Sequence, residues 1–504
     1  MDSREKIFFK AYSIRRRDNK GSHSYIKLFD VINTFKGKEY DTQLLKSRLK
    51  KAGFSNSLKK AKEHLTKAIL KSLTEYHSDT SESIQMRALL DQAEILISKK
   101  IYKVAKKILL KTEKLARAYE KHGALIEICS LRSTIARETA SQVELEYVTK
   151  EQIKYERRYS DYIRNIVEYK HLADKVHYLL NESDNKVQNS SGVREILNSP
   201  LLTSPKAALT HHAIRDYYNI HFQTSFFLQK GFDSKLAGRR QGDWIKYLES
   251  DKLKLFNRLS NEYLTALSNM MVIQSISREY QECEVLLNKA DAFFNSLPSK
   301  RRTKVLELKI FVLTINYMVS QIKSGNPKKS IEAGEKIIAI ATGENPNRIV
   351  LWDNLFSAYF LLEDYHEALK HLNEIINFKQ KYRPDVQAMS RIYLLLTHYE
   401  LGHLELLPYL AKQARHFFIK HECFSEFKKA MIQFFEKEIH IPEKKQERII
   451  AFNKLKQRLE TLFENPKYSA YLEYFNFISW LESKIENRPF VEILREKTLQ
   501  KRNR

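Results

Sequence analysis

Apolar residues recur along almost the whole chain at positions i, i+3, i+4 and i+7, the spacing of one face of an α-helix. Runs that alternate apolar and polar residues, as a half-buried strand would, are nearly missing. The turn signals between the apolar stretches are short, such as the Gly, Asn and Pro at 325–327. Successive helices joined by brief turns predict an all-α protein built from antiparallel helix hairpins.

Three segments repeat one spacing of large and small residues without gaps. In each, two apolar positions are followed by a turn, an aromatic residue and a small residue, which would allow the second helix to cross the first closely. The segments are Leu89, Ala93, Tyr102, Ala105 and Leu109; Leu267, Met271, Tyr280, Cys283 and Leu287; and Trp352, Phe356, Tyr365, Ala368 and Leu372.

The third segment, with Leu355 and Tyr359 added to its first helix, resembles the tetratricopeptide-like helical-repeat family. The resemblance implies a superhelical array of hairpins, a tetratricopeptide-like solenoid, and another kind of helical array is the alternative. In such an array the first helix of each hairpin lines a concave surface, where a segment of a partner protein binds.

Several further stretches are similar to a family of uncharacterised bacterial proteins of this architecture. They are EKIFFKAYS and SYIKLFDVIN near the N-terminus, EHLTKAILKSLTEYHS, and FNFISWLESKIENRPFVEILRE near the C-terminus. This resemblance implies an N-terminal helical module attached to repeats, and it implies no activity.

Turn-forming residues and the distribution of charge divide the chain into five parts. They are a basic N-terminal helical module over 1–78, a first helical-repeat segment over 79–180, a loop rich in Ser, Asn and Pro over 181–205, tetratricopeptide-like repeats over 206–440, and C-terminal capping helices over 441–504. Within the last part, the apolar period predicts helices over 449–463, 471–486 and 490–499.

Composition narrows the class of protein further. The chain has 12 Gly and 10 Pro among 504 residues, where average usage would give about 60 of the two together. This shortage argues against hairpin-rich β folds and collagen.

The first 20 residues are charged throughout, no window approaches the ~18 apolar residues of a membrane span, and Cys129, Cys283 and Cys423 form no C-x-x-C pair. We therefore expect a cytoplasmic protein with no membrane partner.

Positive charge is concentrated near the N-terminus. The net charge is +26, and residues 1–120 hold 28 Lys+Arg against 14 Asp+Glu. Helices are predicted over 57–75, capped by Ser55 or Ser57, and over 102–119. Each would carry lysines opposite an apolar face, and the apolar face of the second helix includes Val104. The candidate residues for binding a polyanion or an acidic partner are Arg15, Arg16, Arg17, Lys46, Arg48, Lys50, Lys51, Lys60, Lys67, Lys71, Lys103, Lys106, Lys107, Lys111, Lys114 and Arg117.

These features favour a non-enzymatic protein-interaction scaffold that binds an acidic or extended segment of another protein. The alternative is a protein that associates with RNA, ribosomes or DNA through its basic N-terminal module. A helix, a turn at Gly53 and a second helix could follow one another between Leu44 and Leu58, as in DNA readers, although the spacing departs from the standard motif.

The sequence offers no arrangement typical of catalysis, and we predict no cofactor and no metal. His366 and His371 are five residues apart, which places them on different faces of a helix. His211, His212 and His221 have no cysteine or carboxylate set to complete a zinc site. The Gly325 segment lacks the second glycine of a phosphate-binding loop.

Overall fold

The computed structural model describes most of the chain, and all of its regular elements there are helices. The all-α prediction is therefore confirmed. The described residues are 1, 3–15, 24–35, 42–54, 57–77, 82–181, 189–227, 233–250, 259–338, 347–378, 383–439, 445–465, 468 and 471–502.

The chain forms two compact units. Unit 1 contains Met1–His171 and Ser204–Ile214, and unit 2 contains Leu172–Thr203 and Arg215–Arg504. The first division falls inside helix α9 (Ile153–Asn181), so one continuous helix contributes to both units.

Unit 1 begins with four helices that share a small apolar core. They are α1 (Ser3–Arg15), α2 (Ser24–Asn33), α3 (Thr42–Lys51) and α4 (Leu58–Tyr76). Helices α1 and α2 pack against α4, and buried Phe9, Leu28, Leu45 and Leu65 lie in the core. Helix α4 confirms the predicted helix over 57–75, and its N-cap residue Ser57 forms no side-chain capping hydrogen bond.

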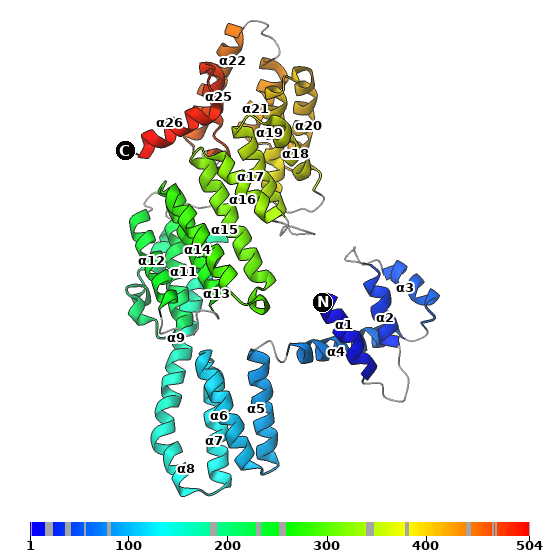
Figure 1. The fold of residues 1–504 in the computed structure, drawn as a ribbon, viewed down its shortest axis with the longest axis vertical. Coiled ribbons are helices and arrows are strands. Elements are labelled where there is room, and N and C mark those ends of the chain that lie inside the picture. The colour runs from blue at the N-terminus through cyan, green and yellow to red at the C-terminus, as the bar shows by residue number, and fades with distance from the viewer. Residues whose placement is uncertain are drawn as a thin grey trace. The chain divides into compact units, whose positions relative to one another are not determined.

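A second group in unit 1 consists of α5 (Glu82–Ser98), α6 (Tyr102–Ala118), α7 (His122–Glu138), α8 (Gln142–Tyr147) and the first part of α9. Helix α6 packs against both α5 and α7. Figure 1 shows the chain turning at α8 and returning along α9. The group has its own core, which contains Leu90, Ala93, Leu109 and Ile128.

Unit 2 is built mainly from consecutive hairpins. Its helices after α9 are α10 (Asn189–Leu197), α11 (His211–Phe227, which starts in unit 1), α12 (Ser234–Glu249), α13 (Ser260–Ile276), α14 (Tyr280–Ser296), α15 (Lys304–Lys323), α16 (Pro327–Ile338), α17 (Arg348–Leu361), α18 (Tyr365–Ile376), α19 (Pro384–Glu400), α20 (Leu407–Lys420), α21 (Glu426–Gln433), α22 (Lys445–Phe463), α24 (Tyr471–Tyr474), α25 (Phe477–Glu486) and α26 (Phe490–Arg502).

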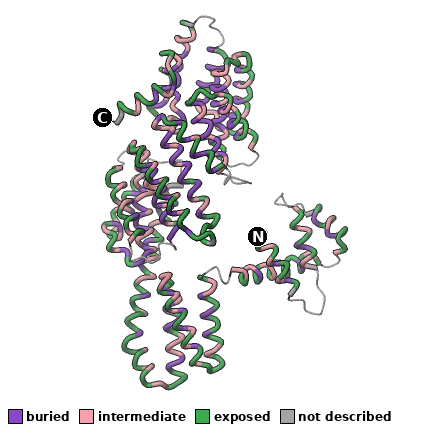
Figure 2. Tube along the Cα trace, in the orientation of Figure 1, coloured by how far each residue is buried: buried purple, intermediate pink, exposed green. Residues whose placement is uncertain are grey.

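In four successive pairs, α13 packs against α14, α15 against α16, α17 against α18, and α19 against α20. The first helices also contact one another in sequence, α13 with α15, α15 with α17, and α17 with α19. Figure 2 shows much of the buried surface of unit 2 on these first helices. The first helices therefore form a continuous inner layer.

Each of the three repeated segments is a helix hairpin, and the small residue of each is fully buried: Ala105, Cys283 and Ala368 are all 0% exposed. Each hairpin also turns through a non-glycine residue in the left-handed region, two positions before the aromatic. These residues are Lys100 (φ 61°), Arg278 (φ 63°) and Glu363 (φ 63°). The N–H of the next residue then bonds a carbonyl of the last helical turn, as when Ile101 N–H donates to Leu96 O (2.8 Å).

The C-terminal helix α26 packs close to the turn between α15 and α16. Arg495 Nε donates to the carbonyl of Gly325 at 2.8 Å, and Thr498 Oγ1 donates to the carbonyl of Lys323 at 3.2 Å. Gly325 has φ +76°, and a Cβ atom there would lie 2.5 Å from Arg495 Cγ. The left-handed turn favours glycine here, and the approach of α26 excludes a side chain at this position.

Three details differ from the sequence predictions. The loop predicted over 181–205 is wrong for 189–197, which form α10. The single helix predicted over 471–486 is wrong as well, because Asn476 caps a new helix and its Oδ1 accepts from Ser479 N–H at 3.0 Å. The third difference is that α15 is long and apolar enough, by length and composition only, to cross a membrane, which the sequence analysis did not predict. Within its apolar window, 56% is buried inside the protein.

Candidate functional site

The structure places the predicted positive residues of α3 in two different situations. Lys46, Lys50 and Lys51 are exposed and form no ion pair with any described residue. Arg48 instead lies with its guanidinium 4.6 Å from the centre of the Phe35 ring and donates to Thr34 Oγ1 at 2.8 Å. Arg48 therefore stabilises the module itself. Arg16, Arg17 and the side chain of Arg15 lie outside the described residues.

Helix α4 has the predicted two faces. Ala61 and Leu65 are buried, whereas Lys60, Lys67 and Lys71 are exposed on the other side, with no ion pair to the described part of the chain. These three lysines are spaced by seven and four residues, so they share one stripe of the helix.

The predicted stripe of α6 is only partly available. Lys103, Lys107, Lys111 and Lys114 are exposed and have no ion pair within the described ranges. The other two cations are engaged within unit 1, and Val104, which was assigned to the packed face, is 45% exposed. The engaged pairs are Lys106 with Glu144, and Arg117 with Glu113 at 2.7 Å, a carboxylate that Arg132 also contacts.

The ion pairs that Glu113 forms with Arg117 and Arg132 affect the pKa of its carboxyl. The Arg132 and Arg117 side chains hydrogen-bond Glu113 and lower the pKa of that carboxyl, although burial of the group acts in the opposite direction. Arg117 is therefore part of an internal charge cluster, and the accessible positive stripe of α6 ends at Lys114.

Unit 2 contains a cleft, and none of the residues that line it was predicted as a binding residue from the sequence. Its volume is about 620 Å³, and the inner layer of first helices lines one side of it. Helix α15 contributes Val319, α17 contributes Asp353 and Ser357, and Val386 comes from α19. Helix α26 closes the other side, where Leu494 is one of the lining residues.

Positive side chains predominate around this cleft. Arg278, Lys323, Arg383 and Lys497 line it, and Asp353 is the one carboxylate among its lining residues. Arg383 pairs with Asp385 at 2.7 Å, and Lys497 pairs with Glu482. Arg278 has no ion pair with a described residue.

Asp353 is an unusual carboxylate. Its Oδ1 atom is buried and accepts no hydrogen bond within the described part of the structure. Burial raises the pKa of its carboxyl to about 7, against the opposing effect of Arg383. Near neutral pH the group is therefore partly protonated, which reduces the negative charge inside the cleft. The sequence held one signal for it, because Asp353 interrupts the apolar run of α17.

The histidines considered as metal ligands differ in their burial and in the residues they contact. His366 is exposed, whereas His371 is 8% exposed and stacks on Tyr359 at 5.5 Å between ring centres. His221 is held by Leu202 and Arg240. Among the described residues, no three His, Cys, Asp or Glu side chains are grouped so that they could hold a metal ion.

Comparison of the sequence with models of protein families gives no match, and comparison with curated proteins gives none either. The features that bear on function are therefore the exposed lysines of α3, α4 and α6 and the cleft of unit 2.

Proposed function

We propose that the protein is a non-enzymatic cytoplasmic scaffold that binds an acidic, extended segment of another protein in the cleft of unit 2. We also propose that its hairpins form a tetratricopeptide-like superhelix. The observation that carries the proposal is the lining of the cleft by four consecutive first helices, α13, α15, α17 and α19.

The chemistry of the cleft supports an acidic partner. Four cations line it, of which Arg383 and Lys497 are paired with carboxylates outside the lining, and burial raises the pKa of Asp353, the one carboxylate among the described lining residues, to about 7. Apolar side chains such as Val319, Ile322 and Leu494 lie between the charges. An extended chain with acidic and apolar side chains would match both features, since complementary charge increases the rate and specificity of association.

The charge of the cleft leads to a direct prediction. The double substitution Arg278→Gln with Lys323→Gln is expected to weaken binding of a labelled peptide that alternates Glu and Leu by about tenfold or more, because two cations are removed from its site. Fluorescence anisotropy measures the change. The matched control is Arg301→Gln with Lys412→Gln, two exposed cations outside the cleft lining, which should leave the affinity unchanged. Equal binding of a Lys–Leu peptide by the natural protein would contradict the proposal.

Association with nucleic acid or ribosomes is the second candidate function. It is favoured by ten exposed lysines of α3, α4 and α6 that form no ion pair with a described residue: Lys46, Lys50, Lys51, Lys60, Lys67, Lys71, Lys103, Lys107, Lys111 and Lys114. Clustered cations of this kind release counterions when they bind a phosphate backbone. Helices α3 and α4 follow one another on either side of Gly53 (φ +66°), while residues 55–56 between them lie outside the described residues.

This candidate predicts a strong dependence on salt. On duplex DNA, log affinity should fall with log salt by about 0.9 for each phosphate contact, so Lys60→Gln, Lys67→Gln and Lys71→Gln together should reduce the slope by about 2 to 3. The control variants Lys412→Gln and Lys420→Gln should leave the slope unchanged. Absence of retention on heparin and on a random oligonucleotide at low salt would exclude this function.

A further inference from the structure

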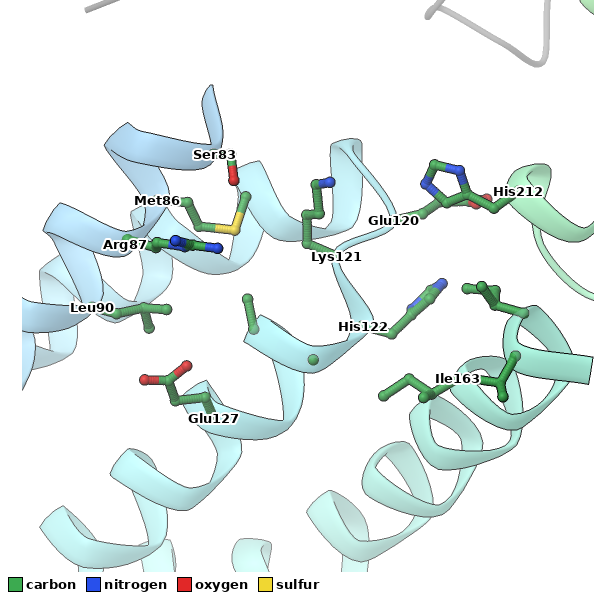
Figure 3. Close-up of a pocket in the computed structure, with 14 residues that line it drawn as sticks. Ser83, Met86, Arg87, Leu90, Glu120, Lys121, His122, Glu127, Ile163 and His212 are labelled. Atoms are coloured by element: carbon green, nitrogen blue, oxygen red, sulfur yellow. The ribbon is translucent and has the colours of Figure 1, made fainter. Parts of the chain in front are cut away.

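Unit 1 contains a cavity of about 450 Å³ that none of the proposals above uses. It lies among the start of α5, the turn before α7, the start of α7 and one face of α9, with His212 at its edge (Figure 3). Its walls combine apolar side chains, such as Leu90, Ile163 and Val167, with two cations, Arg87 and Lys121.

The start of α7 is suited to an anion. The N-cap residue Lys121 provides no side-chain cap, and the N–H groups of Gly123 and Ala124 form no hydrogen bond with a described residue. No atom lies within 4 Å of the place where a Cβ of Gly123 would be, so a ligand can approach the backbone there. The partial positive charge of a helix N-terminus favours an anion at this place.

His122, the first residue of α7, independently indicates a ligand. Its side chain lines the cavity and is only 7% exposed, yet neither ring nitrogen has a hydrogen-bond partner among the described residues. Its ring packs against Tyr159 and Tyr162, with centres 6.0 and 4.8 Å apart. Burial, with His212 beside it, lowers the pKa of His122 to about 4, so the neutral ring presents one donor and one acceptor. A buried ring with both nitrogens unsatisfied is unfavourable, and a ligand that hydrogen-bonds the ring would remove this penalty.

The charges around the cavity favour an anion over a cation. Arg87 and Lys121 are exposed and form no ion pair with any described residue. Glu120 is already engaged, because its Oε2 accepts from the backbone N–H of His211 at 2.8 Å. Glu127 also lines the cavity, more than one turn beyond the start of α7, and Figure 3 draws its carboxylate on the side of Leu90 and Arg87, apart from Lys121. Two cations and free backbone N–H groups therefore surround the start of the helix.

We propose that this cavity binds a small organic anion, a carboxylate that carries an apolar chain. The carboxylate would accept from the N–H groups of Gly123 and Ala124 between Arg87 and Lys121, and it would hydrogen-bond His122. The chain would lie against Ile163 and Val167 of α9, since cavities of this size bury most of the surface of a small ligand.

Octanoate is the probe that tests this proposal, with the full-length protein and isothermal titration calorimetry below its critical micelle concentration. We expect saturable binding at one site per chain, and no comparable binding of octylamine, which has the same chain and the opposite charge. Absence of saturable octanoate binding, or equal affinity for octylamine, would overturn the proposal.

Three variants locate the site. Gly123→Leu should abolish octanoate binding without loss of thermal stability, because the added side chain enters open space at the cavity. Arg87→Gln with Lys121→Gln should weaken binding about fivefold or more. His122→Phe, which keeps a ring beside Tyr159 and Tyr162, should also weaken it. The controls Lys114→Gln and Arg137→Gln lie outside the cavity lining. If Gly123→Leu bound octanoate as tightly as the natural protein, the ligand would not lie at α7.

Discussion

Replacing Trp480 with alanine is expected to lower the free energy of unfolding of unit 2 by about 4 kcal/mol. Trp480 in α25 is 0% exposed and lies among the rings of Tyr399, Phe435 and Phe452. Its Nε1–H donates to Glu400 Oε1 at 2.6 Å. The substitution removes a large buried ring and one hydrogen bond together. Urea unfolding followed by far-ultraviolet circular dichroism measures the change.

Two further variants separate the ring from the hydrogen bond. Trp480→Phe keeps most of the apolar contact, and Glu400 keeps its ion pair with Lys484 at 2.7 Å, so the loss should be about 1 to 2 kcal/mol. Ile419→Ala, at a side chain that is 59% exposed, should change stability by less than about 0.5 kcal/mol. A Trp480→Ala loss no larger than that of Ile419→Ala would show that α25 does not stabilise unit 2.

Acid is expected to destabilise unit 2 through His221, with a contribution of about 3 kcal/mol lost between pH 6.5 and pH 4. Burial, with Arg240 beside the ring, lowers the pKa of His221 from its ordinary value of 6.5 to about 4. Between these values the unfolded chain binds a proton more readily than the folded one, so stability falls as the pH falls. Above pH 6.5 both states are neutral and the contribution is fully present.

The hydrogen bonds of His221 explain why the neutral ring is required. Arg240 Nη1 lies 2.8 Å from His221 Nδ1, which must therefore accept, and Nε2 lies 3.1 Å from the carbonyl of Leu202, to which it must donate. A proton on Nδ1 would point at a guanidinium that can only donate. Folding and proton uptake therefore oppose each other at this ring.

Unfolding free energies measured in denaturant from pH 7 to pH 4 test this prediction. His221→Gln should lose stability at neutral pH, because the Arg240 contact is changed, and should show a shallower decline with acid than the natural protein. The exposed His366→Gln serves as the control and should retain the natural slope. If His221→Gln kept the natural slope, the acid sensitivity would come from other groups.

The helices were predictable because their causes are local. In α4 and α6 the apolar period alone placed Ala61, Leu65, Ala105 and Leu109 on buried faces. The hairpins followed from one repeated spacing, which also marked the closely packed position of Cys283. The misplaced residue, Val104, lies near the edge of its apolar face, where burial depends on whether a neighbouring helix covers it.

The candidate sites were predictable only in part. Charge counting found the lysines of α3, α4 and α6, but it could not show that Arg117 pairs with Glu113 or that Arg48 lies on Phe35. Such pairs depend on side chains brought together by folding. Arg278 in the cleft and His122 in the cavity belong to no recognisable sequence motif. The residues that surround each of them come from several helices, which only folding brings together.

The sequence by itself determined the all-helical class, the hairpin units and the excess of positive charge near the N-terminus, since periodicity, turn residues and composition are properties of short segments. Tertiary structure alone decided which charges stay accessible, where the cleft and the cavity lie, and how α26 closes the cleft. Arg495 reaches Gly325 across a separation of 170 residues. Contacts over such distances arise from packing of the whole unit, and no local pattern encodes them.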